Sequence, residues 1–193
     1  MIKINIENET AQLKAVLVGI ADDFGGTPSI EECYDPKSKE HVEAGIFPYQ
    51  KDCVLAMETL IAVLEKYNVK VYRPKNIKGL NQIFSRDIAF AIEDKLVLPN
   101  IIEARRKELN AIYDILNNIE ESDKIKIPEN ARVEGGDVIL GNEYIFVGYS
   151  ENEDFEKYIV SRTNRSGLDF LVKNFPNKKV KGLELKKSDD NAR

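Results

Sequence analysis

Cysteine and histidine are scarce in this sequence: its 193 residues include two cysteines, Cys33 and Cys53, and one histidine, His41. Two cysteines without a recognisable spacing make neither a disulfide framework nor a zinc site, so we expect no metal. Continuous apolar runs of about 18 residues, the length of a membrane span, are also missing. Residues 1–7 alternate as a strand does and lack the long apolar run of a signal peptide. We therefore expect a cytoplasmic protein.

A basic excess is missing as well, because 33 acidic residues outnumber 28 basic ones and give a net charge of −5. A nucleic acid or an anionic membrane would favour a basic face, so neither is an expected partner. The hydrophobic content of 42% is ordinary for a soluble globular protein, and the length allows one sizeable core or two small ones. Small molecules and proteins remain as possible partners.

Two acidic motifs stand directly before two similar apolar patterns. The first motif is FSRD at residues 84–87, followed by two short apolar runs within residues 88–98. The second is RVEGGD at residues 132–137, followed by two such runs within residues 138–147. Paired runs with a short polar break are typical of a β-hairpin. A repeat of this kind, roughly 50 to 60 residues long, predicts modules that each offer an equivalent loop to one shared site.

The rest of the pattern predicts helices and strands in alternation. Residues 50–67 and residues 102–119 place apolar side chains at helical spacing. Residues 21–49 are rich in Gly, Pro and acidic residues and are far longer than a usual connection, so they form a candidate lid. The further expected elements are strands at residues 13–20, 69–74 and 180–185 and a short helix at residues 167–175.

The two motifs, together with SRTNRSG at residues 161–167, resemble motifs of the guanidine-modifying enzymes. These enzymes are the arginine deiminases, the dimethylarginine hydrolases and the amidinotransferases, and the resemblance runs from about residue 16 to about residue 171. It implies an α/β fold of the pentein type, a propeller of five strand-strand-helix modules around one active site. About three of the five modules fit in this chain, so we expect residues 1–193 to be a single such domain, incomplete at its C-terminus.

The resemblance also implies a site for the guanidino group of arginine or an arginine-like substrate. A guanidinium is planar, permanently charged and offers five N–H donors, so two carboxylates in its plane recognise it best. By resemblance, Asp87 pairs with the guanidinium and Glu134 is the second carboxylate, and both are predicted catalytic residues. Arg86, Asp137, Arg162 and Asn164 are predicted substrate-binding residues. The resemblance also implies that Asp137 supports the Gly135-Gly136 turn or orients the catalytic histidine, and that Arg86 orders the site. No cofactor is expected.

Each of these residues also has a structural interpretation. EGGD alone is typical of a glycine-rich turn with solvated acids. Arg86, beside an aspartate, is typical of a structural ion pair. Arg162, Thr163 and Asn164 suit a substrate carboxylate. Asn164 or Ser166 suits equally well the N-cap of the helix that follows. FSRD, EGGD and SRTN in this order favour the guanidinium site.

The resemblance implies that a thiolate attacks the guanidino carbon and leaves a covalent amidino-enzyme, while a histidine moves the protons. Hydrolysis and transfer to an amine both remain open. Cys33, Cys53 and His41 do not match the positions implied for the nucleophile and the base, which are not found in this chain. A longer protein, a second polypeptide that completes the ring or a natural remnant without catalysis would each explain this. The expected partners are a small guanidino substrate and either a homo-oligomer or a completing C-terminal segment. The alternative function is a non-catalytic, propeller-like binding module.

Overall fold

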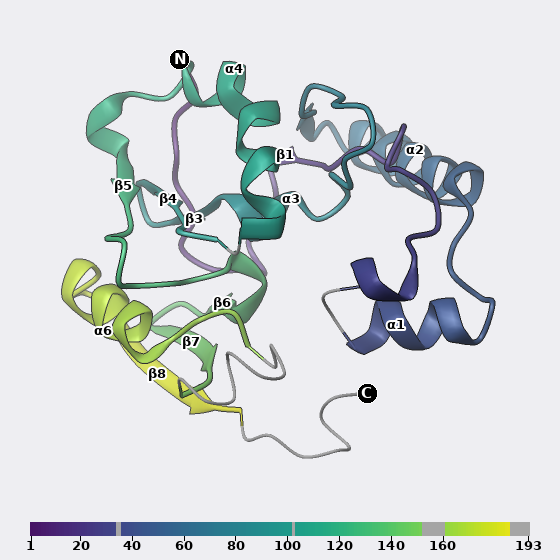
Figure 1. Cartoon of the computed structure of the whole chain (residues 1–193). Helices are drawn as coiled ribbons and strands as arrows, with labels where there is room; N and C mark the ends of the chain where they lie inside the picture. Colours follow the sequence, from purple (N-terminus) through teal and green to yellow (C-terminus); the bar gives the residue numbers. More distant parts are fainter. Residues whose placement is uncertain (34–35, 102, 152–160, 186–193) are drawn as a thin grey trace. The chain divides into compact units, whose positions relative to one another are not determined.

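The computed structural model describes the chain in four stretches: residues 1–33, 36–101, 103–151 and 161–185 (Figure 1). The chain divides into two compact units. The first unit consists of Met1–Ala11, Arg86–Glu103 and Ile119–Arg193, and the second of Gln12–Ser85 and Ala104–Asn118. Every predicted site residue therefore lies in the first unit, whereas both cysteines and the histidine lie in the second.

The second unit contains a parallel pair of strands, β1 (Ala15–Leu17) and β2 (Lys70–Tyr72), with helix α2 (Gln50–Lys66) between them in sequence. These elements confirm the strand and helix predicted at residues 13–20 and 50–67. Ile61 is buried on α2, because it lies on the apolar stripe that the helical spacing indicates. Beyond Tyr67 the chain turns through Asn68, whose φ of 58° lies in the left-handed region.

The candidate lid at residues 21–49 contains short helices. They are the 3₁₀ helix η1 (Ile30–Glu32) and α1 (Pro36–Glu43), and residues 34–35 lie outside the described residues. A capping box closes the N-terminus of η1, where the backbone N–H of Ser29 donates to the Glu32 carboxylate at 2.8 Å. The stretch is thus more ordered than its composition indicates, and its role as a lid stays a prediction.

The helix predicted at residues 102–119 is mostly a 3₁₀ helix, and its first residue lies outside the described residues. It consists of η2 (Glu103–Ile112) followed by α4 (Tyr113–Leu116). In a 3₁₀ helix, side chains three positions apart eclipse each other. Arg105 and Glu108 stand at this spacing and form a buried bidentate ion pair, with two N–O distances of 2.7 Å. This pair favours the tighter helix, which apolar periodicity alone does not reveal.

The first unit contains two three-stranded sheets of the same design. The first sheet consists of β3 (Phe90–Ile92), β4 (Lys95–Leu98) and β5 (Lys124–Lys126), and the second of β6 (Val138–Leu140), β7 (Tyr144–Tyr149) and β8 (Lys179–Glu184). In each, an antiparallel hairpin is extended by a parallel strand. This confirms both predicted hairpins and the predicted strand at residues 180–185, whereas β5, preceded by the short η3 (Glu121–Asp123), was not predicted.

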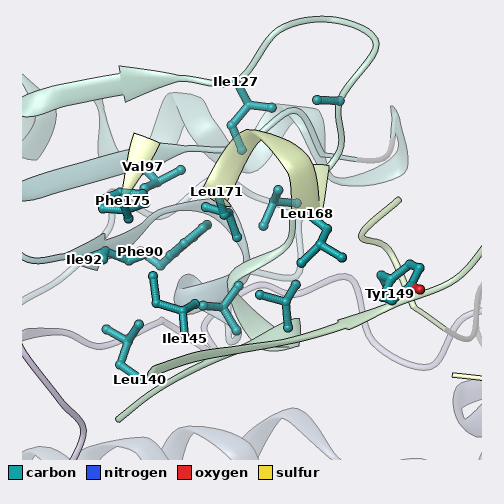
Figure 2. Packing of buried hydrophobic residues seen from close by; sticks show 14 residues of the cluster. Phe90, Ile92, Val97, Ile127, Leu140, Ile145, Tyr149, Leu168, Leu171 and Phe175 are labelled. Carbon is teal, nitrogen blue, oxygen red and sulfur yellow. The ribbon is translucent and has the colours of Figure 1, made fainter. Parts of the chain in front are cut away.

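Helix α6 (Arg165–Asn174) precedes β8 and confirms the short helix predicted at residues 167–175. Its residues Leu168 and Leu171, with Phe175 beyond its end, are buried against the strands (Figure 2). The strands contribute alternate residues to this core, since Val138 and Leu140 are buried and Ile139 is exposed. The other buried members are Phe90, Ile92, Val97, Ile127, Ala131, Val133, Ile145, Val147 and Tyr149. The core thus fixes both hairpins, whose first strands directly follow the acidic motifs.

The N-terminal residues do not form the strand that their alternation indicates. Ile6 makes one isolated antiparallel bridge with Glu93, at the turn of the β3–β4 hairpin. Within the four described stretches, no helix combines the length and apolar character needed to cross a bilayer.

Candidate functional site

The EGGD motif forms a single 3₁₀ turn, η4 (Gly135–Asp137), directly before β6. Glu134 precedes the turn, and its side chain is 5% exposed. Its backbone carbonyl accepts a hydrogen bond from the Asp137 N–H at 3.0 Å, and its own N–H donates to Thr163 Oγ1 at 3.2 Å. The turn therefore holds a glutamate carboxylate that is almost completely removed from water.

Arg86 and Asp87, the last two residues of the FSRD motif, lie directly against this turn. The motif forms the short helix α3 (Ser85–Ile88), of which Arg86 and Asp87 belong to the first unit. A Cβ atom at Gly135 would lie 2.1 Å from the Arg86 carbonyl oxygen, and one at Gly136 would lie 2.6 Å from Asp87 Oδ1. Both distances are far below van der Waals contact. A side chain at position 135 would clash with backbone, whereas one at position 136 would require the Asp87 carboxylate to move. The Asp87 carboxylate thus lies on the turn that carries Glu134.

The guanidinium of Arg86 is bonded to the same turn. Its Nε donates to the Gly135 carbonyl at 2.9 Å, and its Nη2 donates to the Val138 carbonyl at 2.6 Å. Nη2 also contacts the Glu9 carboxylate at 2.6 Å. These bonds match the interpretation of Arg86 as a residue in a structural ion pair that orders the site.

Asp137 is committed to the SRTN segment. Its Oδ2 accepts hydrogen bonds from Ser161 Oγ at 3.1 Å, from the Arg162 N–H at 3.1 Å and from Thr163 Oγ1 at 2.8 Å. Burial raises the pKa of Asp137 above its ordinary value, and the hydrogen bonds from Thr163, Ser161 and Arg162 only partly oppose this rise. The carboxylate therefore positions the loop that carries Arg162.

This raised pKa predicts how Asp137 changes stability with pH. Because the folded state binds the proton more tightly than the unfolded state, Asp137 favours folding below the ordinary carboxyl pKa of about 4. That contribution is lost as the pH rises through the raised value. The free energy of unfolding of the parent, minus that of Asp137→Asn, should therefore fall from about pH 3 to about pH 7. Urea titrations across this range measure it, and a difference that rises with pH would contradict the assignment.

Arg162 and Glu134 form an ion pair, through Arg162 Nη1 and Glu134 Oε1. The Arg162 side chain is 22% exposed and the Glu134 side chain 5%, so the arginine reaches the surface while the carboxylate is buried. Glu134 thus already binds one guanidinium, which is the group that the sequence predicts for its ligand.

Asn164 is the N-cap of α6. Its Oδ1 accepts hydrogen bonds from the backbone N–H groups of Gly167 and Arg132, both at 2.9 Å. Its own N–H donates to the Arg132 carbonyl at 3.1 Å. The cap interpretation is therefore correct for Asn164, and Ser166 is not the cap. Asn164 fastens the SRTN segment to the start of the RVEGGD motif.

The six predicted residues thus belong to one network around η4. The sequence does not single out Glu9 or Ser161. Thr163, a candidate for the substrate carboxylate, instead bonds to Asp137 and to the Glu134 N–H. In the described part of the chain, no three His, Cys, Asp or Glu side chains gather as ligands of a metal ion. The network combines the carboxylates of Glu134 and Asp137 with the guanidinium groups of Arg86 and Arg162, an arrangement suited to binding cations or anions of that kind.

No protein-family model matches the chain. An uncharacterised protein of Bacillus subtilis (strain 168), YkgA, is 30% identical over 96 residues, which are 49% of this chain and 33% of that protein. The solved structures of similar fold include the following three. SxtG, an amidinotransferase from Microseira wollei, is 17% identical with a TM-score of 0.70, and the match covers 94% of this chain and 62% of that chain.

The second solved structure is the dimethylarginine hydrolase DDAH from Pseudomonas aeruginosa, a mutant complexed with citrulline. It is 16% identical with a TM-score of 0.68, covering 92% of this chain and 63% of that chain. The third is the N-terminal domain of ArgZ, an arginine dihydrolase from cyanobacteria, bound to product. It is 16% identical with a TM-score of 0.69, covering 91% of this chain and 59% of that chain. The chain spans about three fifths of these solved chains and a third of YkgA.

Proposed function

We propose that this chain, which has the fold of the amidinotransferases and dimethylarginine hydrolases, binds the guanidino group of arginine or an arginine-like substrate. One observation carries the proposal: the Asp87 carboxylate lies on the EGGD turn, beside Gly136, and Glu134 of that turn already pairs with a guanidinium. The similar solved structures are of an amidinotransferase, a dimethylarginine hydrolase and an arginine dihydrolase, and they support the same substrate class.

In this proposal, Asp87 and Glu134 accept hydrogen bonds from the planar fork of the substrate guanidinium. Arg162 then turns from Glu134 to the substrate carboxylate, which it binds bidentately. Arg86, Asp137 and Asn164 position the loops and do not contact the substrate. Two carboxylates in a partly closed site would discriminate a cation from a neutral analogue of the same shape.

The proposed reaction class is attack of a thiolate on the guanidino carbon, with loss of an amine and a covalent amidino intermediate. Water then gives hydrolysis and an amine gives transfer. This chain supplies the carboxylate part of the site, since its motifs contain neither a cysteine nor a histidine. We further propose that the sheets are successive modules of one cytoplasmic, pentein-type propeller domain, that residues 21–49 act as its lid, and that a completing segment supplies the thiol and the imidazole. A homo-oligomer of this chain would repeat the same residues and would not supply them.

Calorimetric titration of the chain with arginine and with citrulline tests the binding proposal. Citrulline has the same length and carboxylate as arginine but carries a neutral ureido group. We expect arginine to bind and citrulline to bind at least about tenfold more weakly, because one charge-assisted hydrogen bond contributes about 1.5 kcal/mol or more. Equal affinities for the two ligands would contradict recognition of a guanidinium by carboxylates.

We expect the chain of this sequence to bind arginine without converting it. Its thiols are those of Cys33 and Cys53 and its imidazole is that of His41, all outside the three motifs. Assays for citrulline, ornithine and amidino transfer should therefore give no product above background. Turnover that disappears in Cys33→Ser but persists in Cys53→Ser would contradict this expectation and identify Cys33 as the nucleophile.

A second candidate function is a module that binds a guanidino ligand and never cleaves it. Cys33, Cys53 and His41 all lie outside the three motifs, which favours a module without a nucleophile and a base. Adding a protein segment with the missing thiol and imidazole separates the two candidates. If the chain is part of an enzyme, arginine turnover should appear; if it is a binding module, none should.

A further inference from the structure

Residues 6–9, here called the N-terminal strap, hydrogen-bond to both hairpins of the first unit. Ile6 and Glu93 exchange two backbone hydrogen bonds, with N–O distances of 2.8 and 2.7 Å. Three residues later, the Glu9 N–H donates to the Leu140 carbonyl at 3.2 Å. The strap thus connects the turn of the first hairpin to the end of β6 in the second.

Glu9 also reaches the candidate site through its side chain. Its Oε1 accepts hydrogen bonds from Arg86 Nη2 at 2.6 Å and from the Leu140 N–H at 3.1 Å. The same Nη2 donates to the Val138 carbonyl, and Nε donates to the Gly135 carbonyl. The Glu9 carboxylate therefore holds the guanidinium that spans η4, from Gly135 at its start to Val138 just beyond its end.

We propose that Glu9 is a positioning residue for the carboxylate site, acting through Arg86; this inference rests on the proposed function. Arg86 directly precedes Asp87 in the chain, and its carbonyl contacts Gly135, which directly follows Glu134. Fixing the Arg86 side chain on η4 thus fixes the backbone on which both carboxylates stand. A charge-assisted hydrogen bond from a carboxylate to a guanidinium is stronger and more directional than a neutral one.

The solvent exposure of the Glu9–Arg86 pair limits how much Glu9 can contribute to arginine affinity. The Arg86 and Glu9 side chains are 47% and 35% exposed, so water and salt screen their attraction. Exposed pairs contribute up to about 1 kcal/mol, which corresponds to a change of up to about fivefold in affinity. The effect should decrease as the salt concentration rises.

The strap offers a matched control in Glu7. Its Oε2 contacts Lys178 Nζ at 2.6 Å, the same distance as in the Glu9–Arg86 pair. Lys178 also donates to the carbonyls of Glu7 and Asn142, at 3.2 and 2.8 Å. Glu7 thus fastens the same strap to the same unit through Lys178, which also donates to the β6–β7 turn and not to η4.

Arginine affinity, amide hydrogen exchange and urea stability of Glu9→Ala, Glu9→Gln and Glu7→Ala test the proposal. Glu9→Ala should weaken arginine binding by up to about fivefold at low salt, and Glu9→Gln, which keeps an acceptor for the Leu140 N–H, should recover part of the loss. Glu7→Ala should leave the affinity unchanged, even where it lowers stability as much. Equal effects of Glu9→Ala and Glu7→Ala on arginine affinity would overturn the positioning role.

The exchange measurement separates this inference from the proposed function. The Asp137 amide, which donates to the Glu134 carbonyl, reports on η4 without any ligand. If the parent does not bind arginine, the proposed function fails, and the exchange rate alone decides the inference. Faster exchange at Asp137 in Glu9→Ala but not in Glu7→Ala supports the positioning of η4 by Glu9, and equal rates in the two variants overturn it.

Discussion

Replacing Asp87 with asparagine is expected to weaken arginine binding by about a hundredfold, because it removes one of the two charges that face the guanidinium. Loss of one partner from a buried, hydrogen-bonded charge pair costs about 2 to 5 kcal/mol, and about 2.8 kcal/mol corresponds to a hundredfold change. Calorimetric titration of Asp87→Asn and of Glu134→Gln measures the loss. The expected effect is on affinity, with little change in urea stability for Asp87→Asn.

Asp94→Asn is the matched control, since Asp94 is an acid of the β3–β4 hairpin turn whose side chain is 68% exposed and pairs with Lys95. It should leave arginine affinity unchanged. Gly136→Ala should reproduce much of the Asp87→Asn effect, because the added methyl group would lie 2.6 Å from Asp87 Oδ1 and displace that carboxylate. If Asp87→Asn binds arginine no more weakly than Asp94→Asn does, the assignment of Asp87 is wrong.

Replacing Gly135 with alanine is expected to destabilise the fold by about 3 kcal/mol, the upper part of the range for overpacked sites. The added methyl group would lie 2.1 Å from the Arg86 carbonyl oxygen and 3.1 Å from the Phe90 Cβ. A backbone oxygen cannot rotate away as a side chain can, so the two motifs must separate. Urea denaturation followed by far-UV circular dichroism measures the change.

Gly141→Ala is the control for Gly135→Ala, because its added methyl group would find its nearest neighbour at 3.7 Å, an ordinary contact. It should change stability by less than about 1 kcal/mol. Gly135→Ala with a stability equal to that of Gly141→Ala would contradict the close approach of FSRD to the EGGD turn.

The sequence predicts those elements that local patterns specify. Both hairpins follow from paired apolar runs with a short polar break, and α2 follows from its apolar stripe. The sequence does not predict strand β5, because three residues, Lys124–Lys126, are too few to show the alternation of a strand. Parallel pairing with β4 holds this strand in place. The 3₁₀ geometry of η2 brings Arg105 and Glu108 into a buried ion pair, and a helical stripe indicates neither the pair nor the tighter helix.

The sequence predicts which residues form the candidate site but not which of their side chains bond to one another. FSRD, EGGD and SRTN indicate the carboxylates and the arginines, but not which of them pair. Asn164 was equally consistent with a substrate contact and a cap, because both require the same residue type, and only the contacts to Gly167 and Arg132 identify the cap. Glu9 carries no local signal at all, since its partner Arg86 lies 77 residues away.

A crystal structure of the chain soaked with arginine tests the central claim most directly. We expect the guanidinium of arginine to lie between Asp87 and Glu134, within hydrogen-bonding distance of both carboxylates. We also expect the Arg162 side chain to have turned from Glu134 to the arginine carboxylate. Arginine bound elsewhere, or Asp87 and Glu134 facing different surfaces in that structure, would contradict it.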